Sequence, residues 1–450
     1  MRKIINYNIW LLIILMCWSC DSLLENDLPS NEVIAEDALE SANDVQQLLN
    51  STYDVTANVF NGNNQRFSEL LADNVTILGN SGFLVQVYNR STDFFNSDVG
   101  GYYGQPYIAI LRANTILEGI DDVDLTQDQR DRFEGEAKFL RAINHFALVR
   151  HFAQPAGYTA DNSHLGIVVK SSAEIKTDVR SSVDAAYDLI IADLEDAVDL
   201  LPAQNGNYAT TYAAQAYLAK VYFQMNNFAQ AAAYASDVIE NGPFTFSDDI
   251  NSRYGTSVSS ESIFTLISTG LEDNRAGNFK GMYDSRAAVP TLLVSDDYFS
   301  LVNSSGGERS AWVENIGGSK VFTKFNRDYM NVSLTNLTEL LLIAAESYAE
   351  LNQNLSTAID YVNTIKDRAG VALLSDGSSA GLIISEARKE RRIEFGGEGY
   401  RLHELKRRGT LGEAVLIRNA PWDCNGMVLQ FPASEQAVKG FEMNPEGGCN

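Results

Sequence analysis

A chain of 450 residues that is 45% hydrophobic and 10% aromatic is too apolar to stay disordered, and its length fits one large domain or two to three average ones. The formal charge of −25 at pH 7 repels phosphate backbones and anionic lipid head groups, which argues against a nucleic-acid partner. Attachment to a membrane would therefore need a lipid anchor rather than a basic surface.

The first residues have the features of an export signal. Arg2 and Lys3 supply a short positive region, and an almost unbroken apolar run follows over 9–18. That run is far shorter than the roughly 20 residues that a spanning helix needs. We therefore expect a signal peptide over 1–19.

The end of this signal resembles a lipobox, the motif in which a cysteine becomes the lipidated first residue of the mature chain. Ser19 stands directly before Cys20, although Cys17 occupies the position where a lipobox usually carries leucine. We expect lipidation at Cys20, followed by an acidic linker over 20–31. The alternatives are a plain secretory signal and a redox pair formed by Cys17 and Cys20.

Helical periodicity dominates the rest of the chain. Its plainest example is 133–153, where Phe133, Leu140 and Leu148 share one face and further apolar residues widen that face nearly all round. We expect a single domain over 32–450. Its helical scaffold would cover about 37–55, 107–240 and 337–410, its irregular excursions about 60–106 and 244–334, and its C-terminal tail 411–450.

One stretch has the spacing of a tetratricopeptide repeat, a pair of helices that approach closely through small residues. "TYAAQAYLAKVYFQMNNFAQAAAYASDVIENGP" contains two helical runs joined by Asn226 and Asn227. A weaker copy occurs in "LTELLLIAAESYAELNQNLSTAIDYVNTIKDRAG", where Ala358 takes the place of Ala231. The excursion between the two copies contains short β-like runs such as "SIFTLIS" and "KVFTKF".

Several segments together resemble the SusD/RagB family of outer-membrane lipoproteins that capture nutrients. They are "EGEAKFLRAINHFALVRHFA", "AAYDLIIADLEDAVDLLP", "AAQAYLAKVYFQ", "VNTIKDRAG", "ARKERRIEFGGEGYRLHELKRRG" and "FPASEQAVKGFEMNP", in family order and at about the family spacing. The chain departs from the pattern in being short and in carrying His403 where an aromatic or similar residue often stands.

The resemblance implies a mainly α SusD-like fold, with a tetratricopeptide-type scaffold of helical pairs, long irregular loops and a few short β-strands. It implies a partner, a TonB-dependent transporter of the SusC/RagA type, and a ligand, usually a glycan, held in the irregular half. It also implies a lipid-anchored position on the outer membrane facing the exterior, with Asp21, Glu25 and Asp27 resembling the export tag of the family.

Candidate ligand contacts come from the aromatic and polar cluster "QVYNRSTDFFNSDVGGYYGQPY" and from one later loop. Exposed rings stack on the apolar faces of sugars, while Asn, Asp and Arg hydrogen-bond the hydroxyls. The residues we expect at the site are Tyr88, Asn89, Arg90, Tyr102, Tyr103 and Trp312. The alternative is that these rings pack beneath the loop, which we favour for Tyr107 at a helix start.

Cys424 and Cys449 lie in the Gly- and Pro-rich tail of an exported chain. An oxidising compartment favours a disulfide between them, which would close a loop of about 26 residues and stabilise the fold by roughly 3 to 4 kcal/mol. The alternative is two unpaired thiols. Zinc is disfavoured because no histidine stands near either cysteine in the sequence.

The basic segment 387–409 is interpreted as structural, because Glu386 with Lys389 and Arg391 with Glu394 have the spacing of ion pairs along one helix. The four histidines form no metal-binding motif, and the sequence contains no H-E-x-x-H, no G-x-S-x-G and no P-loop. We therefore expect no catalytic residues, no metal and no cofactor.

These observations predict a non-catalytic surface lipoprotein that binds an oligosaccharide and delivers it to a partner transporter. Three alternatives remain: a peptide-capturing member of the same family, a surface glycosidase, and a tetratricopeptide scaffold that binds protein segments. A glycosidase would need two carboxylates at a set separation in space, which the sequence cannot specify.

Overall fold

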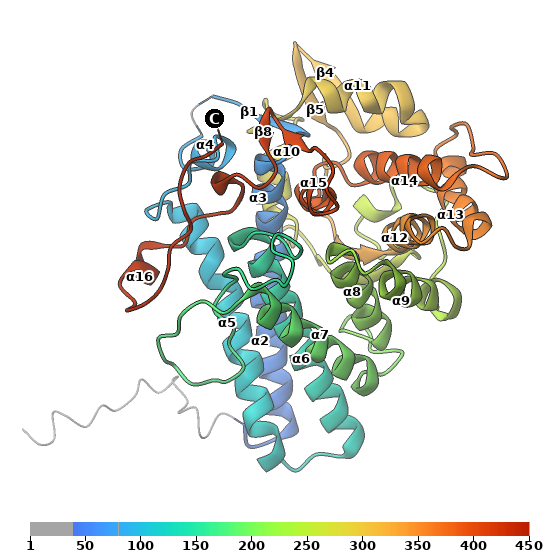
Figure 1. The fold of residues 1–450 in the computed structure, drawn as a ribbon. Helices are drawn as coiled ribbons and strands as arrows, with labels where there is room; N and C mark the ends of the chain where they lie inside the picture. Colours follow the sequence, from blue (N-terminus) through green and yellow to red (C-terminus); the bar gives the residue numbers. More distant parts are fainter. Residues whose placement is uncertain (1–38, 80, 450) are drawn as a thin grey trace, which may run out of the picture.

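The computed structural model describes residues 39–79 and 81–449 and is mainly helical, with 53% helix and 7% strand (Figure 1). The predicted fold class is confirmed. The predicted signal peptide, the lipidation site Cys20 and the acidic linker lie outside the described residues. Among the residues described, none of the helices combines the length and the apolar character needed to cross a membrane.

Six long helices form the first part of the scaffold: α2 (Ala42–Phe60), α5 (Ser97–Gly119), α6 (Gln127–Phe152), α7 (Val183–Leu200), α8 (Thr211–Gln224) and α9 (Phe228–Asn241). Side-chain caps fix their starts. Thr126 and Gln129 form a capping box at α6, in which each side chain accepts the other residue's backbone N–H, and Ser182 caps α7. Each of α5 to α8 packs on the helix that follows it in the chain.

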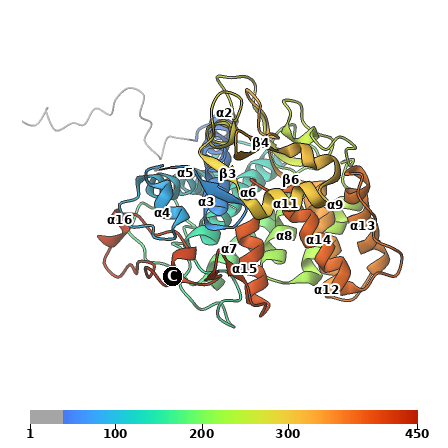
Figure 2. The ribbon, with the colours of Figure 1, turned by 90° about the horizontal axis from the view of Figure 1, so that it is seen from above.

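Four further helices complete the scaffold: α12 (Leu337–Glu350), α13 (Leu355–Arg368), α14 (Ala380–Glu394) and α15 (Tyr400–Thr410). The two predicted tetratricopeptide pairs are α8 with α9 and α12 with α13. Although they are far apart in the sequence, α12 packs directly on α9, so the two pairs form one continuous layer. Seen from above, this layer lies on the opposite side of the molecule from α5 (Figure 2).

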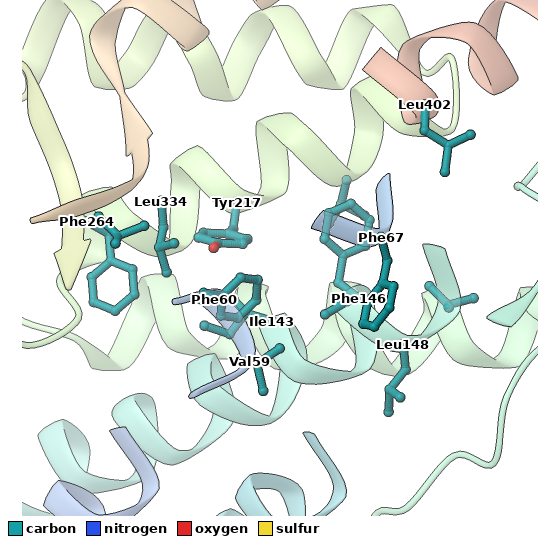
Figure 3. Close-up of a cluster of buried hydrophobic side chains, with 14 of the residues drawn as sticks. Val59, Phe60, Phe67, Ile143, Phe146, Leu148, Tyr217, Phe264, Leu334 and Leu402 are labelled. Carbon is teal, nitrogen blue, oxygen red and sulfur yellow. The ribbon is translucent and has the colours of Figure 1, made fainter. Parts of the chain in front are cut away.

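Small residues allow the helices of each pair to approach closely. Ala231 and Ala235 of α9 and Ala358 of α13 are fully buried, as the repeat spacing predicts. Larger side chains fill the centre of the molecule, where Phe60 of α2, Phe146 of α6 and other apolar residues converge (Figure 3).

The strands are short and pair only in twos, all antiparallel. The pairs are β1 (Val75–Ile77) with β3 (Leu292–Val294), β2 (Ser262–Leu266) with β6 (Val332–Asn336), β4 (Val313–Ile316) with β5 (Ser319–Phe322), and β7 (Leu416–Ile417) with β8 (Ala420–Pro421). Both predicted β-like runs contain strands, β2 and β5. The short helices are α3 (Asn63–Leu71), α4 (Leu84–Tyr88), α10 (Gly277–Tyr283), α11 (Asp296–Ser305) and α16 (Ala433–Gln436).

The structure differs from the sequence expectation at the start of α5. The helix begins at Ser97, where Asn96 caps it, rather than near Tyr107. Glycines and Pro106 obscure the helical pattern in this stretch, because glycine has a low helix propensity and proline removes one backbone hydrogen bond. The excursion over 60–106 therefore contains α3, α4 and the first turns of α5.

Candidate ligand-binding groove

The first half of α5 forms the floor of a groove. Gly100 and Gly104 stand four residues apart and therefore share one face of the helix. A β-carbon at Gly104 would have no heavy atom within 4 Å, and one at Gly100 would meet only Pro432, at 3.5 Å. The missing side chains thus leave open space above the helix.

Two segments that are distant in sequence wall this space. One is the irregular chain of residues 165–180 between α6 and α7, which loops out beside α5, and the other is α16 (Figure 1). Tyr107 donates its hydroxyl hydrogen bond to the carbonyl of Val168 at 2.9 Å, and Asn114 donates to the carbonyl of Ser172 at 2.9 Å. The backbone N–H of Ala433 binds the carbonyl of Phe94 at 2.9 Å, which ties the α16 segment to the chain before α5.

The enclosed volume is about 600 Å³, within the range typical of small-molecule sites. Its apolar lining consists of Tyr103, Tyr107, Ile110, Leu111, Val168, Ile175, Pro432 and Val438. Two internal cavities near Arg150 have only about 50 Å³ each, which suits a few water molecules rather than a ligand. We call the 600 Å³ cavity the α5 groove.

Two tyrosines contribute to the lining: Tyr107 is half-buried, whereas Tyr103 is only 5% exposed and presents little of its ring. Their rings meet edge to face with centroids 5.0 Å apart, and Tyr103 also contacts Phe152 and Phe431. Burial raises the pKa of the Tyr103 hydroxyl, and the neighbouring Tyr107 and Glu435 raise it further. Both phenols are therefore neutral at every physiological pH.

Charged residues surround the groove in pairs. The Lys170 ammonium forms an ion pair with Asp178, and Lys176 pairs with Glu174 at 2.6 Å. Burial raises the pKa of the Glu435 carboxyl, and the Tyr103 hydroxyl and the Lys170 ammonium partly offset that effect. The rim thus has little unbalanced charge.

Of the six residues expected at the site, only Tyr103 lines the α5 groove. Tyr102 is 3% exposed, and its hydroxyl lies 2.9 Å from Asn64 Nδ2 and 3.0 Å from His151 Nδ1 inside the core. Trp312 is 2% exposed and donates its indole N–H to Asn251 at 3.0 Å. Tyr102 and Trp312 therefore pack beneath their loops and present no open ring face to a ligand.

The other three expected residues lie together at α4, away from the groove lining. Arg90 is buried and donates to the Ile417 carbonyl at 2.5 Å, so it supports the β7–β8 hairpin. Tyr88 is half-buried beneath the Arg418 guanidinium, 4.0 Å from its ring centre. Asn89 is exposed.

Sequence reasoning missed most of the groove. Gly104 and Val168 are not among the residues expected from the sequence, and the sequence favours a Tyr107 that packs beneath the loop. The signal present in the sequence was the spacing of Gly100 and Gly104, which on a helix leaves one face without side chains. The walls could not be inferred, because they come from segments far along the chain.

The basic segment is structural, as expected, but one of its two predicted ion pairs is wrong. Glu386 binds Lys389 at 2.7 Å, whereas Arg391 pairs with Glu346 rather than with Glu394. Glu394 instead accepts three guanidiniums from elsewhere in the fold, because its side chain points into the core between α14 and the preceding loops.

Among the described residues no cluster of His, Cys, Asp or Glu has the arrangement of a metal site. His145 and His151 are buried and bond backbone carbonyls of their own helix, at Arg141 and Ala147. The structure joins Cys424 and Cys449 in a disulfide, the pairing expected from the sequence.

Known families and proteins are similar to this chain. A family model described as "Starch-binding associating with outer membrane" matches residues 24–223, and a model described as "SusD family" matches residues 318–437. SusD-like protein P2 of Formosa agariphila is 26% identical over an alignment of 470 positions that covers 88% of this chain and 89% of that protein.

Solved structures have the same fold. A SusD superfamily protein from Bacteroides vulgatus aligns with a TM-score of 0.80 at 22% identity, covering 90% of this chain and 99% of the other. A structure described as a laminarin-binding SusD-like protein aligns with a TM-score of 0.73 at 20% identity, covering 90% and 100%. The chain belongs to the SusD/RagB family.

Proposed function

We propose that this protein captures an oligosaccharide in the α5 groove at the cell surface and delivers it to a TonB-dependent transporter of the SusC/RagA type. Proteins of the SusD family are non-catalytic and bind glycans, and one solved relative is described as laminarin-binding. The observation that carries the proposal is the groove itself, a preformed cavity of about 600 Å³ with aromatic lining and a polar rim.

The lining has the chemistry that a sugar requires. Apolar C–H faces of a pyranose pack against side chains such as Tyr107 and Leu111, and hydroxyl groups at the edge of the sugar reach hydrogen-bonding groups at the rim. Exposed hydroxyls of Thr177 and Ser434 and the Lys176 ammonium lie at that rim. A preformed groove also limits the ordering cost of binding.

The test is affinity electrophoresis of the chain that begins at Asp21, run in gels containing laminarin, starch or other polysaccharides. We expect retardation by one glycan class without release of products. Gly104→Leu should remove the retardation, since leucine at this position projects into the groove. Gly101→Leu is the matched control, because Gly101 is exposed, lies outside the groove lining and also has no heavy atom within 4 Å of its β-carbon position.

Binding to peptides and to no polysaccharide would contradict the glycan proposal and favour the peptide-capturing alternative. Retardation that persists unchanged in Gly104→Leu would show that the glycan binds elsewhere, and the exposed surface around Asn89 and Phe83 would then be the next region to mutate.

We also propose that a lipid on Cys20 anchors the chain to the outer membrane with the domain facing the exterior. The family model that matches residues 24–223 is described as associating with the outer membrane, and the lipobox supplies the attachment. Cys20→Ala should abolish labelling by a palmitate analogue and release the protein from the membrane fraction. Retention of both label and membrane association in that variant would refute lipidation at Cys20.

Delivery to a transporter is tested by affinity purification of the anchored protein from detergent-solubilised outer membranes. We expect a TonB-dependent β-barrel to co-purify in stoichiometric amount. Purification of the protein alone, under conditions that preserve membrane complexes, would contradict the partnership.

A further inference from the structure

The interior of the α5 groove is more apolar than a bare sugar needs. Ile110 and Val168 form its deep wall, and Ile175 covers it from the loop between α6 and α7. Ile175 is 90% exposed, so its apolar side chain is available for contact with a ligand. The surface available inside the groove is therefore suited to burying an apolar group.

Two polar side chains of the interior, Tyr107 and Asn114, already have partners. The Tyr107 hydroxyl donates to the Val168 carbonyl, and Asn114 uses its amide N–H on Ser172 and its carbonyl oxygen on Arg141 Nη1 at 2.7 Å. A sugar ring placed deep in the groove would leave hydroxyls without partners, which is costly in a buried site. Sugar hydroxyls therefore fit the rim, and an apolar group fits the interior.

Charge disfavours an acidic group in that interior. Lys170 is paired with Asp178 and Lys176 with Glu174, so no cation of the described lining is left over to neutralise an acidic substituent. The formal charge of −25 for the whole chain repels anions as well.

We propose that the ligand of this groove is a glycan without acidic groups that carries an apolar substituent, such as an acyl ester, an alkyl ether or an aryl group. The substituent occupies the space above Gly104, between Tyr107 and Ile175, and the sugar binds at the rim near Thr177 and Ser434. This inference rests on the proposed function and narrows its ligand class.

The first experiment tests the apolar interior independently of any sugar. The chain that begins at Asp21 is titrated with the uncharged fluorophore N-phenyl-1-naphthylamine, whose emission rises in an apolar site. We expect saturable binding by the parent and by Gly101→Leu, and an affinity at least tenfold lower in Gly104→Leu. Equal binding by all three proteins would overturn the assignment of an apolar site to this groove.

The second experiment tests the substituent. Matched pairs of glycosides, such as 4-nitrophenyl and methyl β-glucoside and the corresponding laminaritriosides, compete with the fluorophore. We expect the aryl member to displace it at a concentration at least tenfold lower, with 4-nitrophenol alone weaker than the aryl glycoside. Equal competition by aryl and methyl glycosides would overturn the inference and leave glycan capture intact.

Two further outcomes distinguish a failure of this inference from a failure of the proposed function. If the fluorophore binds and Gly104→Leu removes it, yet no glycoside or polysaccharide competes, glycan capture in the groove is refuted, and the glycan half of this inference falls with it. If polysaccharide binding is lost in Gly104→Leu but the parent binds no fluorophore, glycan capture stands and the apolar substituent is refuted.

Discussion

At the scale of single residues, the most unusual feature is a fully buried carboxylate shared by three arginines. Glu394 lies 2.8 to 2.9 Å from guanidinium nitrogens of Arg253, Arg309 and Arg368, and all four side chains are at most 1% exposed. Burial alone would raise the pKa of Glu394, but the three guanidiniums lower it to about 2. The cluster therefore joins α13 and α14 to two distant loops.

Replacing Glu394 by Gln should destabilise the fold by about 3 to 5 kcal/mol, because buried guanidiniums lose their shared counter-charge. Urea denaturation followed by circular dichroism measures the loss. Glu350→Gln is the control, since Glu350 binds Arg388 but is partly solvated, and it should cost less than about 1 kcal/mol. Equal losses in the two variants would contradict this account of the cluster.

Three buried histidines, His145, His151 and His403, make stability depend on pH. Burial lowers the pKa of His145 and of His151 to about 3, from an ordinary value of 6.5. The histidines of the unfolded chain therefore take up protons below pH 6.5 that those of the folded chain do not accept. Their contribution to stability is greatest above that pH and falls on acidification. Between pH 7 and pH 5 each histidine should cost about 2 kcal/mol.

Urea denaturation at the two pH values measures this effect. In His145→Gln, the change in the free energy of unfolding between pH 7 and pH 5 should shift by the contribution of one histidine. Glu394 titrates in a lower window, because its depressed pKa makes its contribution fall only as the pH drops from about 5 toward 2. A His145→Gln variant with the same pH dependence as the parent would show that His145 is not buried in neutral form.

At the scale of elements, α5 combines weak local helix propensity with the surface that forms the groove floor. Gly100, Gly101 and Gly104 each lower helix propensity, and Pro106 removes one backbone hydrogen bond. The helix forms because its later residues, including Ile110 and Ala113, are buried against α2 and α6. Tertiary packing thus maintains a helix whose glycines leave the groove open.

Gly104→Ala and Gly101→Ala should each raise the free energy of unfolding by up to about 1 kcal/mol, since alanine has the higher helix propensity and neither β-carbon meets a neighbour. Gly409→Ala provides the contrast, because its β-carbon would overlap the Trp422 ring. This substitution should lower the free energy of unfolding by about 1 to 3 kcal/mol. Thermal unfolding of the three variants checks the order, and a destabilised Gly104→Ala would contradict an open groove floor.

The elements differ in how far the sequence could predict them. The 133–153 periodicity located α6, and the repeat spacing located α8, α9, α12 and α13, because apolar residues at helical intervals mark a buried face. The start of α5 was missed because glycines weaken that pattern. Tyr102 and Trp312 stand among polar residues in the sequence, yet both are buried, since long-range packing decides which side of a loop faces the core.

At the scale of the whole molecule, the C-terminal tail completes the groove. The Cys424–Cys449 disulfide ties its two ends together, and Asn444 binds the carbonyls of Phe152 and Leu429 at 2.9 and 2.8 Å. α16 lies within the chain that this disulfide closes. One wall of the groove therefore lies within a covalently closed loop.

Replacing both Cys424 and Cys449 by serine should lower the free energy of unfolding by about 2 to 4 kcal/mol, because the unfolded chain gains the entropy of the opened loop. Denaturation of the parent chain with and without a reductant measures the same quantity, and the double variant should show no response to the reductant. A parent chain that is equally stable under both conditions would contradict a structural role for this bond.

The central claim is that the α5 groove binds the glycan. Calorimetric titration of the parent chain, Gly104→Leu and Gly101→Leu with the polysaccharide found by affinity electrophoresis tests it most directly, since both variants keep or improve the helix. We predict at least a tenfold loss of affinity in Gly104→Leu and unchanged affinity in Gly101→Leu. Unchanged affinity in Gly104→Leu would contradict the account.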